Sequence, residues 1–346
     1  MELNKGTLIV REGVRQGDSL SPLLFCIAEE VLSRGISKLV DEGKLELISA
    51  SRNAKIHSHC FYVDDLMVYC KGKIAGLEAL KNLSIRYANC SSQIINTSKS
   101  SFFASGISQH RLQSIVNLLG FTQGSLPFTY LGAPIFKGKP KKIYFQSIAD
   151  KVKLKLASWK TSLLSIAGRV RLVKSVVQSM LLHTMNIYSW PVSLLKDIER
   201  WMKFFIWSGD INKRKLVTVA LKKVCANFEK GGLNVRSLIA LNEATNIKLC
   251  WDLLQSQEQW AQIIRSRVLR GNNCIRHHVF SSIWSSAKNE FNIIKDNSNW
   301  LVGNGTQINF LLDSWCGDPL HQVLNVTNDV MSNFSSSLID YILNGH

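Results

Sequence analysis

The segment HCFYVDDLMVYC, residues 59–70, constrains the fold of this chain most strongly. It places two adjacent carboxylates, Asp64 and Asp65, inside a run that is otherwise almost wholly apolar. Two neighbouring acids that lose solvent repel each other, which raises their pKa values unless a positive group neutralises them. The alternation of residue types on both sides predicts two short strands, bent into a hairpin around the two acids.

A divalent metal ion is one group that would neutralise this pair. Carboxylate oxygens at a sharp turn suit Mg²⁺, which takes one or two protein carboxylates and completes its shell with water and substrate phosphates. Two such ions activate the attacking hydroxyl and stabilise the leaving oxygen in a phosphoryl transfer. The alternative is an ordinary exposed turn, in which Asp-Asp pairs are common. Taken alone, the pair leaves both interpretations open.

Composition indicates a globular protein with a polyanionic partner. The 346 residues are 46% hydrophobic, which is enough for about two or three structural units. The 42 Lys and Arg against 25 Asp and Glu give a net charge of +17, which favours nucleic acid as partner over an anionic membrane surface. A basic protein with a solvated surface is the alternative.

The cysteine pattern and the apolar segments indicate an intracellular, reducing location. The eight cysteines form no CxxC pair, so the sequence contains neither a zinc ribbon nor a redox motif. The first residues do not resemble a signal peptide. The most apolar later stretch, residues 175–195, is too short and too polar to cross a bilayer, so we expect no membrane partner and no secretion.

Apolar periodicity divides the chain into an N-terminal mixture of strands and helices and a helical remainder. The first predicted helix spans residues 20–43, with its apolar stripe at Leu24, Ile27, Ala28, Val31, Leu32, Ile36 and Leu39. Short strands are predicted at 45–50 and on both sides of the two acids, helices at 74–90 and 110–119, an extended segment at 129–136, and helices at 143–159, 168–185 and 194–207. Compositional changes near 138 and at 209–214 mark two candidate domain boundaries.

The neighbouring motifs resemble a known family. REGVRQGDSLSPLLFCIAEEVLSR precedes the two acids, and CSSQIINTSKSSFF and LPFTYLGAPI follow them. In this order they are similar to the palm of reverse transcriptases from plant LINE-type, non-LTR retrotransposons. Three later segments resemble the thumb and connecting region of the same family: WKTSLLSIAGRVRLVKSVVQSM, KKVCANFEKGGLNVRSL and NWLVGNGTQINF. The resemblance therefore covers nearly the whole chain.

The resemblance implies an α+β fold with three parts. Residues 1–135 would be the C-terminal part of a right-hand polymerase palm, built from antiparallel strands plus helices. Residues 136–210 would be a basic, all-helical thumb, and residues 211–346 a helical connection. The family's zinc-binding-like region and ribonuclease H domain would lie beyond His346.

The resemblance also implies an activity and a set of site residues. The activity is RNA-directed DNA polymerisation, a nucleotidyl transfer that uses an RNA template, a DNA primer, deoxynucleotides and a two-metal Mg²⁺ site. Asp64 and Asp65 would be the catalytic metal ligands and Lys99 a general acid. Arg15, Gln16 and Gly17 would line the nucleotide and template pocket. Tyr130, Leu131 and Gly132 would form the primer grip.

A basic strip follows the predicted palm. Residues 137–174 contain eleven Lys or Arg and one acid, Asp150, which is ten of the seventeen net positive charges. On helices such a strip suits contact with a nucleic-acid backbone, and the alternative is a solvated basic face. The candidate contacts are Lys151, Lys155, Lys160, Arg169, Arg171 and Lys174.

One family element is missing from the pattern. Two-metal polymerases need a further aspartate on a separate strand, which this family carries well upstream of the RQGD motif, and here that motif begins at residue 15. We therefore expect an N-terminally truncated fragment that is catalytically incomplete alone. A non-catalytic nucleic-acid-binding remnant and a pseudogene product without a stable fold are the alternatives. Nuclear or cytoplasmic location follows from the resemblance only.

Overall fold

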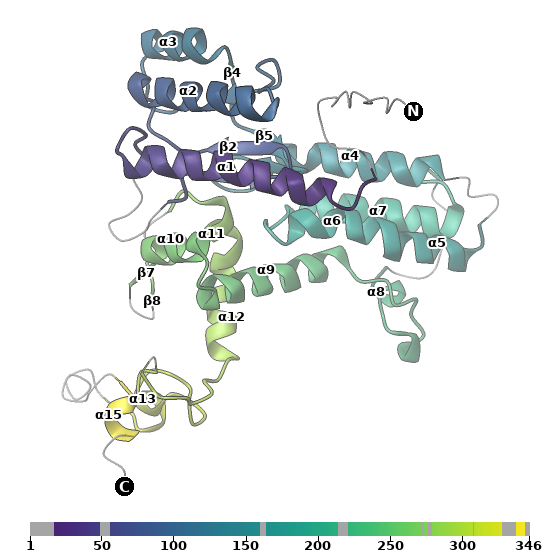
Figure 1. The fold of residues 1–346 in the computed structure, drawn as a ribbon. Helices are drawn as coiled ribbons and strands as arrows, with labels where there is room; N and C mark the ends of the chain where they lie inside the picture. The colour runs from purple at the N-terminus through teal and green to yellow at the C-terminus, as the bar shows by residue number, and fades with distance from the viewer. Residues whose placement is uncertain are drawn as a thin grey trace, which may run out of the picture. The chain divides into compact units, whose positions relative to one another are not determined.

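The structure is a computed structural model that describes residues 17–48, 56–159, 164–213, 221–270, 273–275, 279–306, 308–326 and 337–342. The chain divides into two compact units (Figure 1). The first unit comprises Met1–Lys137 and Ser256–Val279, and the second comprises Gly138–Gln255 and Phe280–His346. The assignments as palm, thumb and connection remain predictions, because unit boundaries alone do not identify them.

The first unit contains the three helices that periodicity predicted near the N-terminus. They are α1 (Ser21–Asp41), α2 (Ile74–Ser91) and α3 (Gln109–Leu119), each within two residues of its predicted ends. A proline in its first turn starts α1, where the missing N–H is not needed. Left-handed Ser92 and Gly120 end the other two helices. The helix α10 (Gln259–Val268) belongs to the same unit.

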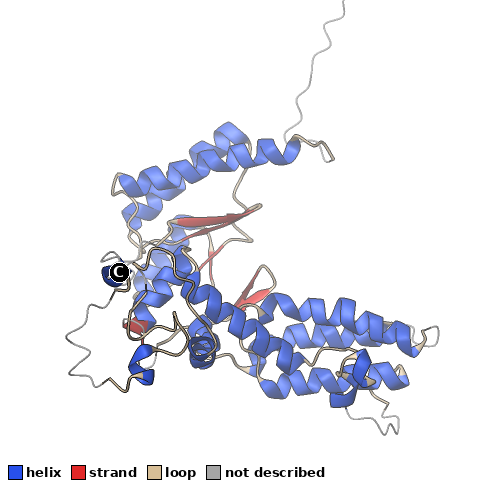
Figure 2. Ribbon diagram, turned by 90° about the horizontal axis from the view of Figure 1, so that it is seen from below, coloured by secondary structure: helices blue, strands red, loops and turns tan. Residues whose placement is uncertain are grey.

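The strands pair as four two-stranded sheets within the described residues. They are β1 (His59–Tyr62) with β2 (Asp65–Val68), β3 (Ser101–Phe102) with β4 (Thr122–Gln123), β5 (Phe128–Tyr130) with β6 (Ala133–Ile135), and β7 (Leu269–Arg270) with β8 (Asn273–Cys274). Only the β3–β4 pair is parallel. Figure 2 shows how short these strands are beside the helices. The predicted hairpin around the two acids is confirmed. Of the strand predicted at 45–50, residues 45–48 are described and form a single bridge, Leu47 with Cys70, whereas residues 49 and 50 lie outside the described residues.

The core of the first unit lies under the C-terminal half of α1. Leu32, Ile36 and Leu39 are buried and pack against side chains of the β1–β2 hairpin and of α2. The predicted stripe is wrong for the first half of the helix, where Ile27 and Val31 are 64% and 62% exposed. In that half Glu29 contacts Tyr87 of α2, but Leu24, Ile27 and Val31 are exposed. Residues with the same helical spacing are therefore buried at one end of α1 and exposed at the other.

The second unit is predominantly helical. Its longer helices are α4 (Lys142–Ser158), α6 (Gln178–Met185), α7 (Val192–Ser208) and α9 (Leu238–Gln255). Its shorter ones are α5 (Ile166–Leu172), the π-helix η2 (Val173–Val177), α8 (Leu221–Val224), η3 (Phe228–Lys230), α11 (Ser282–Ala287), η4 (Lys288–Glu290), α12 (Phe291–Asp296), α13 (Leu320–Val323) and α15 (Ile339–Ile342). The predicted helix at 168–185 is thus one α-π-α stretch.

The core of the second unit forms where α4, α6, α7 and α9 pack together. Fully buried side chains from these helices include Phe145, Val152, Leu181, Met202 and Phe205. Their spacing along each helix follows the period of about 3.6 residues that a one-sided apolar stripe requires. Burial of these stripes against one another is the main source of stability for helices of this length.

Two buried polar side chains hold α9 in place. Asn242 accepts a hydrogen bond from the backbone N–H of Trp190 (2.8 Å) and donates to the carbonyl oxygen of Tyr188 (3.1 Å). Glu199 on α7 accepts from the backbone N–H of Leu238 (2.7 Å), the first residue of α9. These bonds satisfy backbone groups that burial would otherwise leave without partners.

The mixture of helices and small sheets confirms the predicted α+β class. Among the helices that the structure describes, none combines the length and the apolar character that a bilayer crossing requires.

Candidate metal-binding hairpin and basic helical surface

The two acids lie at the tip of the β1–β2 hairpin. Tyr62 pairs with Asp65 across the two strands, so Val63 and Asp64 form a two-residue loop. Asp65 starts β2, and both carboxylates are exposed. The local sequence explains this arrangement, because the apolar residues on either side pack onto α1 and leave the acids at the turn. Two carboxylates are thereby presented to solvent on one rigid turn.

The predicted metal-binding turn and the predicted primer grip share an unusual backbone conformation. Val63 has φ of 51° and Leu131 has φ of 48°, both in the left-handed region that glycine favours. Leu131 and Gly132 form the two-residue loop of the β5–β6 hairpin, and both have positive φ, as a type I′ turn requires. A branched side chain in this region stores strain, which concentrates at functional sites.

Tyr130 connects the second hairpin to the first. Burial raises the pKa of the Tyr130 hydroxyl, and the nearby groups of Cys60 and Asp65 raise that pKa further. Within the part of the chain that the structure describes, the hydroxyl oxygen is buried and has no hydrogen-bond partner. The structure therefore places Tyr130, predicted for the primer grip, within electrostatic range of Asp65, predicted as a metal ligand.

Glu29 is a third carboxylate near the hairpin, which the sequence analysis did not identify. Burial is the main cause that raises the pKa of Glu29. The hydrogen bond from the Tyr87 hydroxyl (3.4 Å) lowers this pKa, and the negative charge of Asp64 raises it. A signal was present in the sequence, since Glu29 precedes Leu32 by three residues and Ile36 by seven. These spacings place an acid on the buried stripe of α1.

The other predicted site residues of the first unit are not brought to the hairpin by any described contact. Lys99 is exposed on a turn, where its backbone N–H bonds to Asn96. Gly17 has φ of 87° and lies just before α1. Arg15 and Gln16 fall outside the described residues, as does Lys160 of the basic strip. The roles of these residues remain predictions.

The hairpin fits part of a magnesium site. Adjacent, exposed carboxylates match the preference of Mg²⁺ for one or two protein oxygens. Within the described residues, no group of three or more His, Cys, Asp or Glu side chains is close enough together to hold an ion. The donor set at Asp64 and Asp65 therefore suits Mg²⁺ but supplies fewer ligands than a complete two-metal site.

The basic strip divides into exposed and internally bonded residues. Lys151 and Lys155 on α4 and Arg171 on α5 are exposed. Arg169 is half-buried, and its guanidinium donates to the carbonyl oxygen of Ile206 on α7 (3.3 Å). Lys174 is half-buried, with its ammonium 5.4 Å from the ring centre of Phe228. Three of the five described candidates thus face solvent.

Comparison with known proteins supports the resemblance to reverse transcriptases. Residues 1–135 match the model of the family described as reverse transcriptase (RNA-dependent DNA polymerase). These are 135 of the 346 residues, so the N-terminal part of this chain is similar to reverse transcriptases. The match includes both hairpins and α1 to α3, so the site geometry described above lies inside the matched region.

Two plant proteins are also similar to this chain. A putative ribonuclease H protein of Arabidopsis thaliana is 30% identical over 200 residues, which are 56% of this chain and 32% of the relative. An uncharacterized mitochondrial protein of the same organism is 38% identical over 61 residues, 18% of this chain and 50% of the relative. The chain thus spans about a third and a half of these two relatives.

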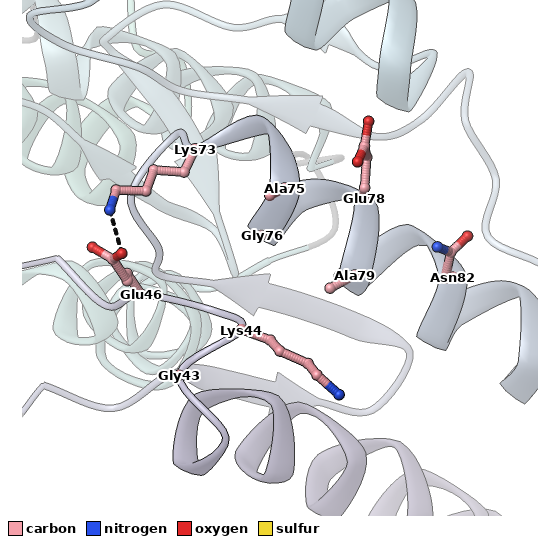
Figure 3. Close-up of a pocket in the computed structure, with 9 residues that line it drawn as sticks. All are labelled: Gly43, Lys44, Glu46, Lys73, Ala75, Gly76, Glu78, Ala79 and Asn82. Atoms are coloured by element: carbon pink, nitrogen blue, oxygen red, sulfur yellow. Dashed lines mark hydrogen bonds and ion pairs between the residues drawn. The ribbon is translucent and has the colours of Figure 1, made fainter.

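A pocket of about 550 Å³ lies elsewhere in the first unit, between the end of α1 and the start of α2. Figure 3 shows Lys73 pointing toward Glu46 at its edge, and Lys44 nearby. Lys71 and Lys73 both form ion pairs with Glu46. The residues that line this pocket include none of the predicted site residues.

Proposed function

We propose that this chain carries the metal-binding part of an RNA-directed DNA polymerase from a plant non-LTR retroelement. The reaction is attack of a primer 3′ hydroxyl on the α-phosphate of a deoxynucleotide, with pyrophosphate as leaving group. The observation that carries the proposal is the pair Asp64 and Asp65 on a two-residue hairpin turn, inside the region that matches the reverse transcriptase family.

The residues of the two hairpins would divide the work. Asp64 and Asp65 would hold Mg²⁺, which when bound neutralises phosphate charge and favours ionisation of the primer hydroxyl. Tyr130, Leu131 and Gly132 would orient the primer end beside them, since Tyr130 lies near Asp65. Lys99 would donate a proton to pyrophosphate, and Arg15, Gln16 and Gly17 would line the nucleotide and template pocket.

Magnesium binding tests the role of the hairpin directly. We expect Mg²⁺ to raise the thermal unfolding midpoint of the wild-type chain, because an ion that binds only the folded state stabilises it. Asp64→Asn should abolish this rise. Asp41→Asn, at an exposed acid on α1, is the matched control and should leave it intact. Equal Mg²⁺ responses in the three proteins would exclude the hairpin as the metal site.

We further propose that the chain does not polymerise alone, because the described residues group no third metal ligand with the two aspartates. Primer extension on an RNA template with Mg²⁺ and labelled deoxynucleotides tests this point. No extension is expected from the wild type or from Asp64→Ala. If the wild type extends the primer and Asp64→Ala does not, a third metal ligand exists within the 346 residues.

A second candidate function is nucleic-acid binding without catalysis, and the exposed cations Lys151, Lys155 and Arg171 favour it. These residues belong to the second unit, so binding through them would be independent of the hairpin. A filter-binding assay with a primer–template duplex separates the two properties. We expect Asp64→Ala to retain binding, whereas a triple substitution of the three cations by Gln should weaken it.

A further inference from the structure

A rigid loop in the second unit presents an aromatic ring to solvent. Residues 224–234, here named the Phe228 loop, extend from α8 (Figure 1). The backbone N–H of Leu233 donates to Val224 O, and that of Asn234 donates to Ala226 O, both at 2.9 Å. A side chain at Gly232 would place its Cβ 2.0 Å from Ala226 O, so only glycine fits there. These contacts fix the conformation of the loop.

Phe228 lies at the tip of this loop, in the short helix η3, and is 65% exposed. The ammonium of Lys174 is 5.4 Å from the centre of its ring, a distance that allows a cation–π contact. Lys174 comes from the π-helical segment η2, and π-helical turns inside α-helices occur frequently at functional sites. An exposed ring and a cation are thus held together by two segments that are distant in sequence.

The base of the loop is fixed by two buried side chains. Gln178, directly after η2, donates to the carbonyl oxygen of Arg236 (2.7 Å). Glu199 accepts from Ser237 (2.9 Å) and from the backbone N–H of Leu238. The Phe228 loop is therefore anchored on the same helix that supplies Lys174, so a ligand would find the ring and the cation already positioned. Such preorganisation reduces the entropy lost on binding.

The charges around the ring suit an anionic ligand. Lys223, Lys230 and Arg236 are exposed on or beside the loop, against one exposed acid, Glu229. Exposed aromatic rings that alternate with cations are the pattern by which proteins bind single-stranded nucleic acid, because every base offers a face for stacking. In a duplex both faces of each internal base are covered by its neighbours, so the ring would have nothing to stack on.

We propose that the Phe228 loop binds single-stranded nucleic acid by stacking an unpaired base on the exposed ring of Phe228, with Lys174 against the adjacent phosphate. This inference rests on the proposed function only in requiring that the chain binds nucleic acid. It adds a specific ligand class, the unpaired strand, and a site outside the region matched to the reverse transcriptase family.

Fluorescence anisotropy with the full chain tests the proposal, using one labelled sequence as single-stranded DNA, as single-stranded RNA and as a duplex. Phe228→Ala should weaken single-strand binding by at least about fivefold and leave duplex binding unchanged. Phe228→Trp should retain single-strand binding, because a larger ring stacks as well. Phe280→Ala is the matched control, since that ring is 66% exposed, and it should change neither affinity.

The salt dependence distinguishes stacking from charge. Lys174→Gln should reduce the magnitude of the log-log salt slope for the single strand by about 1, whereas Phe228→Ala should leave that slope unchanged. If the wild type binds nucleic acid and Phe228→Ala binds the single strand equally well, this proposal is wrong and the proposed function is unaffected. A wild-type chain that binds neither form would overturn nucleic-acid binding altogether.

A structural role for Phe228 also has a distinct outcome. If Phe228→Ala lowered the urea unfolding midpoint and weakened single strand and duplex by the same factor, the ring would only support the fold and the proposal would be wrong. Phe228→Leu then provides the deciding comparison, because it preserves apolar contact with the loop and removes the aromatic face. Loss of single-strand binding by a stably folded Phe228→Leu chain would support stacking.

Discussion

At Val63 a β-branched side chain stands in the left-handed region, with φ of 51°, and is 65% exposed. An L-residue loses about 1–2 kcal/mol there relative to a right-handed conformation, whereas asparagine tolerates it. Val63→Asn should therefore raise the free energy of unfolding by about 1 kcal/mol, measured by urea denaturation. Little apolar contact is lost, since the side chain is mostly in solvent.

Val31 offers a matched control for this substitution. It is 62% exposed but lies in the helix α1, where valine and asparagine have similar propensities. Val31→Asn should change the free energy of unfolding by less than about 0.5 kcal/mol. Equal effects at both positions would indicate that the turn at Val63 is not strained.

Glu29 gives the hairpin region a defined pH dependence. Its pKa is raised in the folded state, mainly by burial, so the ionised carboxylate destabilises the fold. Below the ordinary value of 4.5 the group is neutral in both states and has no effect. As pH rises through the raised pKa the destabilisation develops, and it persists at higher pH.

Glu29→Gln should remove this effect. The variant and the wild type should have equal free energies of unfolding near pH 4, and the variant should be the more stable near pH 7. Parallel urea titrations at the two pH values measure the difference. A constant difference between the proteins at both values would show that the pKa of Glu29 is not raised.

At this scale the sequence predicted Asp64 and Asp65, because adjacent acids in an apolar run are conspicuous without any structure. It did not identify Glu29. Two acids, Glu29 and Glu30, occur side by side on α1, and only the position of the buried stripe distinguishes the inward-facing one. The spacing from Leu32 and Ile36 marks Glu29 as the acid on that stripe, but Tyr87 of α2, which contacts it, is distant in the sequence.

At the scale of single elements, α9 offers two buried asparagines with different surroundings. Asn242 bonds to two backbone groups, whereas the side-chain oxygen of Asn246 is buried and has no partner among the described residues. Asn242→Leu should lower the free energy of unfolding by about 2–3 kcal/mol, because it leaves a buried donor and a buried acceptor unpaired. Urea denaturation measures the loss.

Asn246→Leu is the control on the same helix and should change stability by less than about 1 kcal/mol, since it removes an oxygen that has no partner. If the two substitutions destabilised equally, side-chain volume and not hydrogen bonding would explain the loss.

Helices were the most predictable elements, because α2, α3, α4 and α7 each show an apolar stripe with clear end signals. The π-helical turn at Val173–Val177 was not predicted. The periodicity of apolar residues indicates only that a helix continues. The one extra residue of a π-helical turn shifts the apolar stripe around the helix too little to be recognised over a few turns of sequence. The exposed half of α1 was missed for the complementary reason, since spacing identifies an apolar face but not whether another element covers it.

At the scale of the whole molecule, the net charge of +17 predicts salt-dependent binding to nucleic acid. If about five phosphates are neutralised, the logarithm of the binding constant should fall against the logarithm of salt concentration with a slope near −4.5 for a duplex. Replacing both Lys151 and Lys155 by Gln should reduce the magnitude of that slope by about 2. Binding titrations from low to moderate salt measure it, and an unchanged slope would remove α4 from the interface.

The grouping of segments into units was the least predictable property. The compositional change near residue 138 was visible, but nothing in local pattern indicated that Ser256–Val279 groups with Met1–Lys137. Apolar periodicity indicates which face of a helix or strand is buried. It does not indicate which distant segment packs against that face. Long-range grouping therefore becomes visible only in the three-dimensional structure.

The discontinuity of the first unit has a consequence for the order in which the chain matures on the ribosome. At about 5–20 residues per second, synthesis of residues 138–255 takes roughly ten seconds. During that interval Met1–Lys137 has been synthesised without the segment that completes its unit. The nascent chain therefore passes through a period in which the first unit is incomplete, and partly folded chains with exposed apolar surface are those that chaperones bind.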